Sequence, residues 1–348
     1  MHLSKRFPLL AALAVCGWTA RPAAAHPAWG LVIDPQGRPA FSEVETNTIW
    51  RIENSRPVAI LRGKHSHEIY MDGAGNLYGE HLEYRSAGER WILSLWKLTP
   101  RGREIQILPP TDTVELPNGL SPLHDREGNT WAFRGAFQRV NELILYRRSS
   151  SGEAVAVAGG SPGHADGEGS AARFTGAQGK AFGPEGDLYL TDGGTVRRIT
   201  PRGAVTTVGG NPFAGVSHGE HPQLYGLAVD GRGRIFVADF DHRSVREIER
   251  DGQVREPWRS DRLWAPAGVA EAGGALYILE ARPEALALLG RSGPYARVWR
   301  LDPNGAKTLL ATLGERNAAM AWVLPVAIVV AAALLVWRRR TPAQPGRI

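Results

Sequence analysis

The sequence predicts an all-β protein, a six-bladed β-propeller that is followed by a C-terminal transmembrane helix. Three observations lead to this fold class. A glycine turn recurs six times, four short strands can be placed around each turn, and a stretch of uncharged residues comes after the last unit. At 348 residues, with 43% hydrophobic and 22% charged side chains, the chain is globular. This composition excludes disordered, collagen-like and disulfide-stapled proteins.

Residues 1–25 have the organisation of a secretory signal peptide. A short cationic start is followed by an apolar run over residues 7–15, and Ala23 and Ala25 fit an Ala-x-Ala cleavage rule. An uncleaved N-terminal helix is one alternative, but the apolar run is too short to cross about 30 Å of hydrocarbon. A lipoprotein cleavage before Cys16 is a second alternative, and it would leave a lipid on that cysteine.

Residues 318–337, from Ala318 to Trp337, contain no charge and would span about 30 Å as an α-helix. Arginines follow at once at 338–340, and positive residues stay on the cytoplasmic side of a membrane. We therefore expect a single-pass protein of the cell membrane with a cytoplasmic tail at 338–348. The propeller, at residues 26–314, is expected to be extracytoplasmic (periplasmic), and residues 315–317 form its linker to the membrane.

The net charge of +6 and the pI of about 9.7 come from the two ends of the chain. Residues 1–25 contain three basic residues and residues 318–348 contain four, and neither segment contains an acid. Residues 26–317 therefore carry a net charge of −1, so no nucleic-acid partner is expected. This body contains no cysteine, so no disulfide can stabilise it in an oxidising compartment.

Six turns share a glycine three residues after a mostly acidic position. The glycines lie 38, 53, 58, 47 and 41 residues apart, which matches the roughly 40 to 50 residues of a four-stranded propeller blade. Glycine suits such hairpins because it adopts positive φ at low steric cost. The turns are Asp34–Gly37, Asp72–Gly75, Asp125–Gly128, Gly183–Gly186, Asp230–Gly233 and Glu271–Gly274.

Short strands with alternating apolar residues surround each turn. One apolar strand precedes the turn, a second follows it, and a third carries a basic residue within an apolar pattern. Examples of the third are Ile49–Ile52, Leu95–Leu98, Val196–Ile199 and Val298–Leu301. A pair of sandwich domains would not explain the single repeated motif. The first and last units each look complete, so we expect packing between them, rather than an exchanged strand, to close the ring.

Two segments of the repeat resemble NHL repeats. One runs from Asp166 to Gly210 and the other from Gly226 to Asp239. The resemblance is specific over residues 160–250 and looser over 26–158 and 264–314. It implies the propeller fold, but NHL propellers include both enzymes and binding proteins, so it implies no single function.

The resemblance also implies a central channel that is lined by the innermost strands and has a ligand site at one mouth. We expect the residue five positions before each turn to lie there. These residues are Trp29, His67, Leu120, Gln178, Tyr225 and Pro266, with Asn118 as an alternative in the third unit. Glu68, next to His67, is a further binding candidate.

A second ring is expected six residues after each turn glycine, at Glu43, His81, Arg134, Asp192, Asp239 and Glu280. We expect the carboxylates of this ring to hold the backbone N–H groups of nearby loops. His81 and Arg134 break the pattern, so a site is expected toward the second and third blades. Arg134 is therefore a binding candidate as well. Insertions between second and third strands, at 80–91, 134–141 and 282–295, are expected to form loops suited to recognition.

Looser resemblances point to two kinds of metal-dependent propeller enzyme. The gluconolactonase and senescence-marker propellers hold one calcium ion through carboxylates and asparagines, and Asn118 resembles one of these ligands. In this chain, however, Trp29 and Tyr225 stand where that pattern has acids.

The peptidylglycine amidating lyase is an NHL-type propeller that uses histidines on zinc. The corresponding candidates are His65, His67 and His81, with His218 or His221 as further possibilities. His65 and His67 lie two residues apart on one face of a strand, which is a chelating arrangement.

The sequence contains no phosphate loop, nucleophile elbow or Cys-x-x-Cys motif. We therefore expect a membrane-anchored propeller that binds a protein, peptide or glycan partner. The alternative is a lactonase-type hydrolase or a lyase that uses a divalent metal, zinc or calcium, at the channel mouth. No catalytic residue can be assigned from the sequence.

Overall fold

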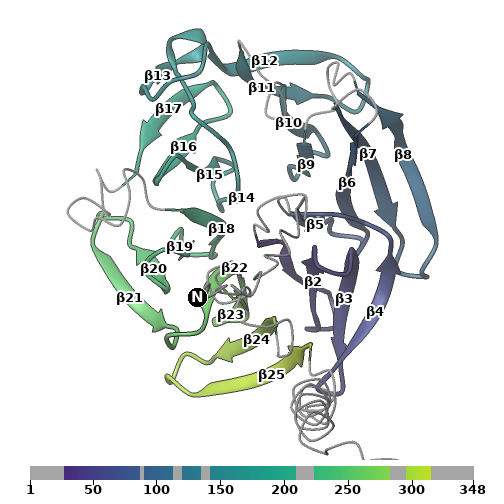
Figure 1. The fold of residues 1–348 in the computed structure, drawn as a ribbon. Helices are drawn as coiled ribbons and strands as arrows, with labels where there is room; N and C mark the ends of the chain where they lie inside the picture. Colours follow the sequence, from purple (N-terminus) through teal and green to yellow (C-terminus); the bar gives the residue numbers. More distant parts are fainter. Residues whose placement is uncertain are drawn as a thin grey trace, which may run out of the picture.

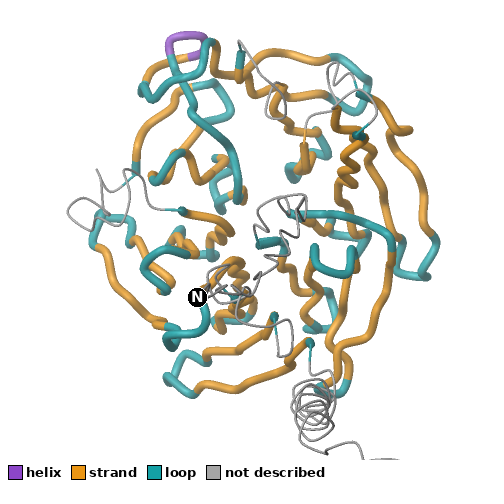
Figure 2. The backbone as a smooth tube through the Cα atoms, viewed as in Figure 1, coloured by secondary structure: helices purple, strands orange, loops and turns teal. Residues whose placement is uncertain are grey.

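The computed structural model describes residues 27–86, 90–112, 120–134, 142–208, 223–282 and 295–314. Within them, six antiparallel sheets are arranged in a ring around a common centre (Figure 1). Strands dominate the backbone, and the one helix of the described part is a single 3₁₀ turn (Figure 2). The six-bladed propeller predicted from the repeat is confirmed.

The first three blades each contain four strands that follow one another in sequence. Blade 1 comprises β1 (Leu31–Ile33), β2 (Pro39–Glu43), β3 (Thr48–Glu53) and β4 (Arg56–Arg62). Blade 2 comprises β5 (Ile69–Met71), β6 (Leu77–Arg85), β7 (Arg90–Leu98) and β8 (Glu104–Thr111). Blade 3 comprises β9 (Leu120–His124), β10 (Thr130–Arg134), β11 (Leu143–Arg148) and β12 (Ala154–Gly160).

The other three blades repeat this order, and blade 4 adds a short strand at its outer edge. Blade 4 comprises β13 (Gly167–Glu168), the 3₁₀ turn η1 (Gly169–Ala171), β14 (Lys180–Phe182), β15 (Leu188–Asp192), β16 (Thr195–Ile199) and β17 (Ala204–Thr207). Blade 5 comprises β18 (Leu224–Val229), β19 (Ile235–Asp239), β20 (Ser244–Ile248) and β21 (Val254–Arg259). Blade 6 comprises β22 (Ala265–Ala272), β23 (Ala275–Ala281), β24 (Ala296–Leu301) and β25 (Lys307–Leu313).

The turn between the first two strands shows why its sequence repeats. In blade 1, Gly37 adopts a φ of 76°, and its N–H donates to the Asp34 carbonyl at 2.8 Å. The Asp34 carboxylate accepts hydrogen bonds from the backbone N–H groups of Gln36 and Arg38, at 3.0 and 2.8 Å. A residue with a Cβ adopts such a φ at a cost, and an aspartate side chain satisfies the N–H groups that the turn exposes.

Blade 2 corrects one expectation about the insertions. Residues 80–91 were expected to include a recognition loop, but β6 and β7 pair continuously from Leu77↔Leu98 to Arg85↔Arg90. The insertion is therefore mainly a longer hairpin. The added residues alternate like the rest of the strands, so the ladder simply continues. Most of the other two insertions lie outside the described residues.

As expected, packing between blades 1 and 6 closes the ring, and these two sheets exchange no strand within the described residues. Phe41 and Ile52 of blade 1 share a buried cluster with Tyr277 and Val298 of blade 6. The blade 1 sheet runs in the order β1-β2-β3-β4, and the blade 6 sheet in the order β22-β23-β24-β25. Side-chain burial rather than a shared strand therefore joins the two ends of the propeller.

The described residues contain no helix that could cross a bilayer. The predicted signal peptide at 1–25, the linker at 315–317, the transmembrane segment at 318–337 and the tail at 338–348 all lie outside those residues. These assignments remain predictions.

We predict that Phe41→Ala destabilises the closed ring. The Phe41 side chain is 1% exposed between the first and last blades, so its truncation should lower the free energy of unfolding by about 3–5 kcal/mol. Urea denaturation of the full chain in detergent micelles measures this change. Val155→Ala, at a site that is 39% exposed on β12, is the control and should change stability by less than about 0.5 kcal/mol. Equal stabilities of the two variants would contradict this account of closure.

Candidate functional site

A row of aromatic rings crosses the centre of the propeller. The Trp29 ring stacks on His67, with centroids 5.3 Å apart, and on Tyr225, with centroids 5.4 Å apart. His65 meets His67 edge-on at 4.9 Å, and Phe240 meets Tyr225 edge-on at 5.4 Å. Trp29 precedes blade 1, whereas Tyr225 belongs to blade 5, and these blades are not neighbours. The contact therefore spans the hub, and we call these five rings the aromatic row.

Backbone contacts fix Trp29 in the row. The N–H groups of Trp29 and Gly30 both donate to the His67 carbonyl, at 2.7 and 2.8 Å. On the other side, a Cβ added to Gly268 of blade 6 would lie 2.6 Å from the Trp29 carbonyl oxygen, so this approach requires glycine. Backbone contacts with blades 2 and 6 are therefore sufficient to position the segment before β1.

Trp29 is also the part of the hub stack that remains open to the surface. His67 and Tyr225 are 8% and 6% exposed, whereas Trp29 is only half-buried. The Trp29 Nε1–H is buried and has no hydrogen-bond partner among the described residues. A buried N–H of this kind favours a ligand that brings an acceptor to it.

A buried ion pair forms a second connection across the hub. Lys180 Nζ of β14 lies 2.5 Å from Glu68 Oε2, which precedes β5, and the Lys180 backbone N–H donates to Glu68 Oε1 at 3.0 Å. The two side chains are only 5% and 6% exposed. Lys180 Nζ also donates to the Gln178 carbonyl at 2.8 Å, while the Gln178 side chain is exposed. The pair joins blades 2 and 4 directly, although blade 3 lies between them in the ring.

The hub is electrostatically unusual around this pair. Burial raises the pKa of the Glu68 carboxyl, and Lys180 offsets part of that effect. Burial and the Glu68 charge raise the pKa of Tyr70 well above its ordinary value. A further carboxylate, Glu80, is 1% exposed and accepts hydrogen bonds from the backbone N–H groups of His67 and Glu68, at 2.6 and 3.3 Å. Three titratable side chains, those of Glu68, Tyr70 and Glu80, therefore lie on the blade 2 side of the hub.

Three of the four carboxylates of the second ring have the structural role expected for them. Asp192 accepts hydrogen bonds from the backbone N–H groups of Thr175 and Gly176, at 2.7 and 2.9 Å. Asp239 accepts one from the backbone N–H of His242 at 3.2 Å, and Glu43 accepts one from Thr46 at 3.0 Å.

Three members of this ring behave differently. Glu280 binds side chains instead of backbone, and accepts from the indole N–H groups of Trp258 and Trp299, at 3.0 and 2.9 Å. His81 replaces a carboxylate as a backbone acceptor, since its Nδ1 accepts from the His65 N–H at 2.9 Å. Arg134 ends β10 and is exposed.

The three candidate zinc ligands all lie in blade 2 or in the segment leading into it, but they do not converge as a ligand set. The His65 Nδ1 lies 2.9 Å from Asn47 Oδ1, and His81 binds the His65 backbone. Burial lowers the pKa of His81, which favours its neutral form. In the described ranges, no three His, Cys, Asp or Glu side chains are grouped as they would be around a metal ion. Asn118, His218 and His221 lie outside those ranges.

The register of one channel position was wrong. Pro266 pairs with Glu280, just as Leu224 pairs with Asp239, so the blade 6 counterpart of Tyr225 is Ala267. The reason is the blade 6 hairpin, in which Ala272 pairs with Ala275 around two glycines. This turn is shorter than those of the other blades. Counting five residues back from it therefore gives Pro266, one residue before the true counterpart of Tyr225.

Sequence reasoning missed Lys180 and Phe240, and it also missed a signal for the hub. A glycine follows the channel position in four blades, at Gly30, Gly179, Gly226 and Gly268. A Cβ added to any of these glycines would meet backbone of a neighbouring blade or segment at 2.2 to 2.7 Å. In blade 2, Glu68 stands where these blades have glycine. That departure could have marked Glu68 as the residue that reaches across the hub.

No protein-family model matches the chain, and no curated protein sequence matches it. Solved structures share its fold. A gluconolactonase from Xanthomonas campestris is 16% identical, with 73% of this chain and 83% of that one covered and a TM-score of 0.51. A putative gluconolactonase is 18% identical, with 74% and 86% covered and a TM-score of 0.50. A Bacteroides thetaiotaomicron protein of unknown function is 13% identical, with 72% and 66% covered and a TM-score of 0.52. These similarities support the propeller fold and carry no activity to this chain.

We predict that Lys180→Met is strongly destabilising at neutral pH. The change leaves the Glu68 carboxylate buried without its cation, which should lower the free energy of unfolding by about 3–5 kcal/mol. The pKa of Glu68 is already raised in the folded state. In the variant this pKa is higher still, because Lys180 no longer lowers it, so the destabilisation should be complete above the variant's pKa and should shrink as the pH falls towards the wild-type pKa and the carboxyl is protonated.

Urea denaturation of the full chain in micelles at several pH values measures this effect. The double variant Glu68→Gln/Lys180→Met removes both charges and should recover most of the stability. A Lys180→Met protein as stable as the wild type at neutral pH would show that the pair does not brace the hub.

Proposed function

We propose that this chain is a periplasmic propeller that binds a protein, peptide or glycan ligand at its hub mouth. In this proposal residues 318–337 anchor it in the cytoplasmic membrane, and the tail at 338–348 lies in the cytoplasm. The observation that carries the binding role is the aromatic row, in which a half-buried Trp29 rests on two buried rings. A rigid tryptophan with an unpartnered indole N–H is a strong anchor for a ligand.

The strand order supports recognition on this face. Trp29 and Tyr225 lie at or just before the beginnings of inner strands. The second ring lies at or near the ends of the second strands, and antiparallel pairing brings those ends to the same face. The long β6–β7 hairpin of blade 2 also turns on this side. The hub mouth is thus framed by hairpins and blade connections, which is where recognition residues tend to lie on rigid scaffolds.

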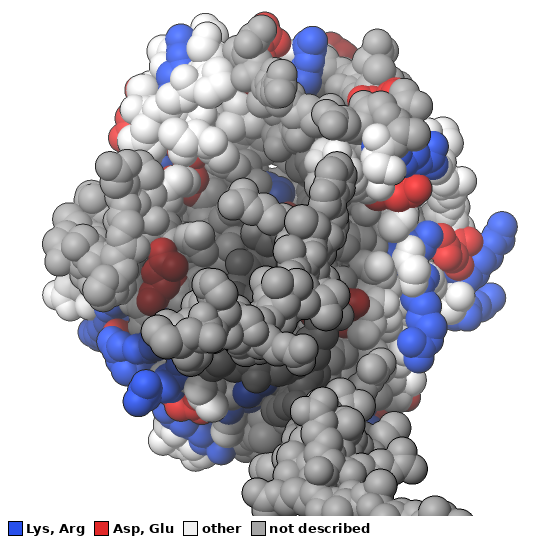
Figure 3. All heavy atoms as spheres, in the orientation of Figure 1, with Lys and Arg blue, Asp and Glu red and all other residues white. Residues whose placement is uncertain are grey.

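The mixed surface charge of this face favours a ligand that is recognised by specific contacts over one that is held by its net charge. Figure 3 shows Lys and Arg side chains interspersed with Asp and Glu around the described rim of one face. No large area of a single sign is visible on the described atoms of that face. An extended polyanion would require such an area, whereas a ligand held by aromatic stacking does not.

We predict that Trp29→Ala weakens ligand binding at least about thirtyfold, because it removes a central aromatic anchor. Panels of peptides and glycans screened against the full chain in detergent micelles provide the ligand, and titration calorimetry measures the affinity. Trp50→Ala is the matched control, because Trp50 is also half-buried but lies on β3, away from the aromatic row. Equal affinities of the two variants would place the ligand elsewhere.

A metal-dependent hydrolase or lyase is the second candidate function. His65 contacts both His67 and His81, the buried Glu80 carboxyl lies 3.4 Å from His67 Nδ1, and solved gluconolactonases share the fold. This proposal predicts about one zinc or calcium ion per purified chain by elemental analysis. His67→Ala should remove the metal, whereas His164→Ala, on the edge of blade 4, should retain it. Wild-type protein purified without chelators and free of both metals would exclude this candidate.

A further inference from the structure

The last strand of the propeller ends on the face that carries the hub mouth. Antiparallel pairing in blade 6 brings Leu313, at the end of β25, level with Ala265, at the beginning of β22. The pairs that connect them are Leu313↔Ala296, Ala296↔Ala281 and Ala281↔Ala265. Inner strands begin on the hub-mouth face, so the chain leaves the propeller on this face.

The predicted membrane segment follows this end of the chain closely. Its uncharged run begins at Ala318, four residues after Gly314. Four residues of extended chain span at most about 14 Å. With the proposed anchor at residues 318–337 in the bilayer, the short linker keeps the end of β25 near the membrane surface.

The β6–β7 hairpin of blade 2 extends beyond the level at which β25 ends. His81 occupies the second-ring position in blade 2, as Glu280 does in blade 6. β23 ends at Ala281, one residue after this position, whereas β6 continues to Arg85. Tyr84 therefore lies two residues beyond the counterpart of Ala281, which is about 7 Å further from the body of the propeller.

An aromatic pair lies on the extended part of this hairpin. Tyr84 pairs with Trp91 across the two strands, and the ring centroids are 5.2 Å apart. Tyr84 is 51% exposed, more than any other exposed large hydrophobic residue of the described chain. The next pair toward the blade on the same face of the hairpin, Leu82 and Leu93, is buried. The apolar side of the hairpin thus continues to an open aromatic end, a combination that suits a membrane interface.

Other exposed residues of the hub-mouth face also suit lipid headgroups. Leu263, in the connection from β21 to β22, is 45% exposed, and its neighbour Arg262 is exposed as well. Arg62 is exposed at the end of β4 in blade 1, which lies between blades 6 and 2. Arginine heads bind phosphate groups while apolar and aromatic side chains enter the interface.

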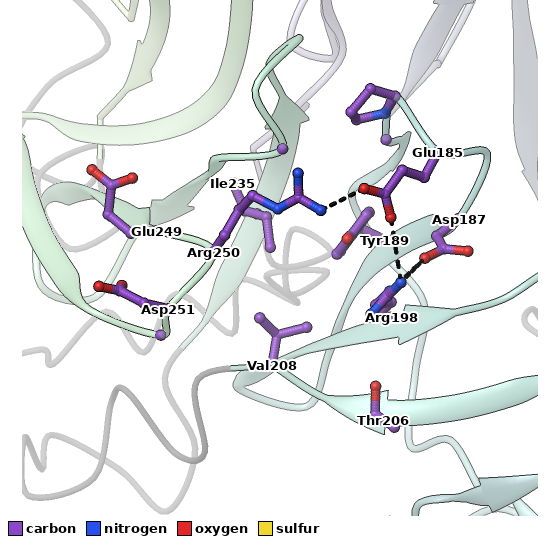
Figure 4. Close-up of a pocket in the computed structure, with 14 residues that line it drawn as sticks. Glu185, Asp187, Tyr189, Arg198, Thr206, Val208, Ile235, Glu249, Arg250 and Asp251 are labelled. Carbon is purple, nitrogen blue, oxygen red and sulfur yellow. Dashed lines mark hydrogen bonds and ion pairs between the residues drawn. The ribbon is translucent and has the colours of Figure 1, made fainter.

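The opposite face of the propeller is polar. Each blade has a turn there after its innermost strand and another after its third strand, and all these turns belong to the described residues. None of them contains an aromatic residue, valine, leucine or isoleucine. Between blades 4 and 5, Arg250 pairs with Glu185 and Arg198 pairs with Asp187, beside a pocket of about 640 Å³ (Figure 4). The turns of this face therefore offer a bilayer no large apolar side chain.

We propose that the hub-mouth face of this propeller rests on the periplasmic surface of the cytoplasmic membrane, with the Tyr84–Trp91 end of the hairpin among the lipid headgroups. This inference rests on the proposed anchor at residues 318–337. The anchor holds blade 6, the hairpin holds blade 2, and Arg62 of blade 1 lies between them at the level of the phosphates. The hub mouth then opens toward the bilayer, so its ligand is one that the membrane surface presents.

Fluorescence quenching on the full chain in lipid vesicles tests this orientation. A fluorophore is attached at Ser86→Cys, in the exposed turn after Tyr84, or at Asn304→Cys, in the exposed turn that precedes β25. Both chains also contain Cys16→Ala, which removes the one natural cysteine. The vesicles contain phosphatidylcholine, phosphatidylglycerol and a lipid with a nitroxide on its headgroup, which quenches nearby fluorophores.

The two labels should differ strongly. The label at position 86 should lose at least about half of its fluorescence, because an interfacial side chain lies within about 5–10 Å of the headgroup boundary. The label at position 304 should lose less than about a tenth, because the seven residues of β25 place it about 20 Å further from the membrane.

Variants of the hairpin show whether the aromatic pair makes the contact. In the chain labelled at position 86, Tyr84→Ser should reduce the quenching at least about twofold, since it removes the exposed ring, and Tyr84→Trp should preserve the quenching. Val155→Ser, at an exposed site on β12, is the matched control and should leave the quenching unchanged.

Flotation of each chain with vesicles in a density gradient tests the anchor separately. A chain that floats but shows equal quenching at positions 86 and 304 would overturn this inference and leave the anchor standing. So would a floating chain in which Tyr84→Ser leaves the quenching at position 86 unchanged. A wild-type chain that does not float would overturn both the anchor and the orientation that depends on it.

Discussion

The hub contacts of Trp29 are the constraint on which the closed ring depends. Its backbone N–H donates to the His67 carbonyl of blade 2, its carbonyl lies against Gly268 of blade 6, and its ring stacks on Tyr225 of blade 5. One residue at the start of the propeller thus touches three blades other than its own. In the part of the chain that the structure describes, the first and last blades exchange no strand, so these contacts and the buried cluster around Phe41 hold the two ends together.

The buried ion pair supports the same centre in another direction. Glu68 and Lys180 join blades 2 and 4, and their side chains are almost fully removed from water. A buried pair of this kind adds little net stability compared with apolar residues, because desolvation offsets most of the attraction. What it supplies is a fixed contact between blades 2 and 4, because Lys180 binds Glu68 through both its Nζ and its backbone N–H. The aromatic row therefore rests on a hub whose blades are fixed relative to one another, as a preorganised binding surface requires.

The fold could be predicted from local sequence, because each blade needs a turn glycine at positive φ and short alternating strands. Gly37 and its equivalents provide the turn glycines, and Ile235–Asp239 is typical of the alternating strands.

The hub was only partly predictable. Counting from the turns selected Trp29, His67 and Tyr225, whose rings stack on one another. The Glu68–Lys180 pair was not found, because its members are 112 residues apart and no local pattern connects them. Pro266 was misplaced because one hairpin is shorter than the rest.

A ring of equivalent blades makes departures from the repeat informative. Equivalent positions of the blades have the same steric and hydrogen-bonding requirements, and the same residue type usually meets them. A different residue at such a position therefore indicates a local requirement of that blade. Glu68 replaces a hub glycine and brings a charge to the centre, and Gly183 replaces a turn aspartate and lets the Tyr189 ring lie against the turn. Glu68 binds Lys180 of blade 4 across the hub, and Gly183 leaves the Tyr189 hydroxyl without the aspartate acceptor that Tyr78 has in blade 2, so each departure changes the contacts of its blade at one position.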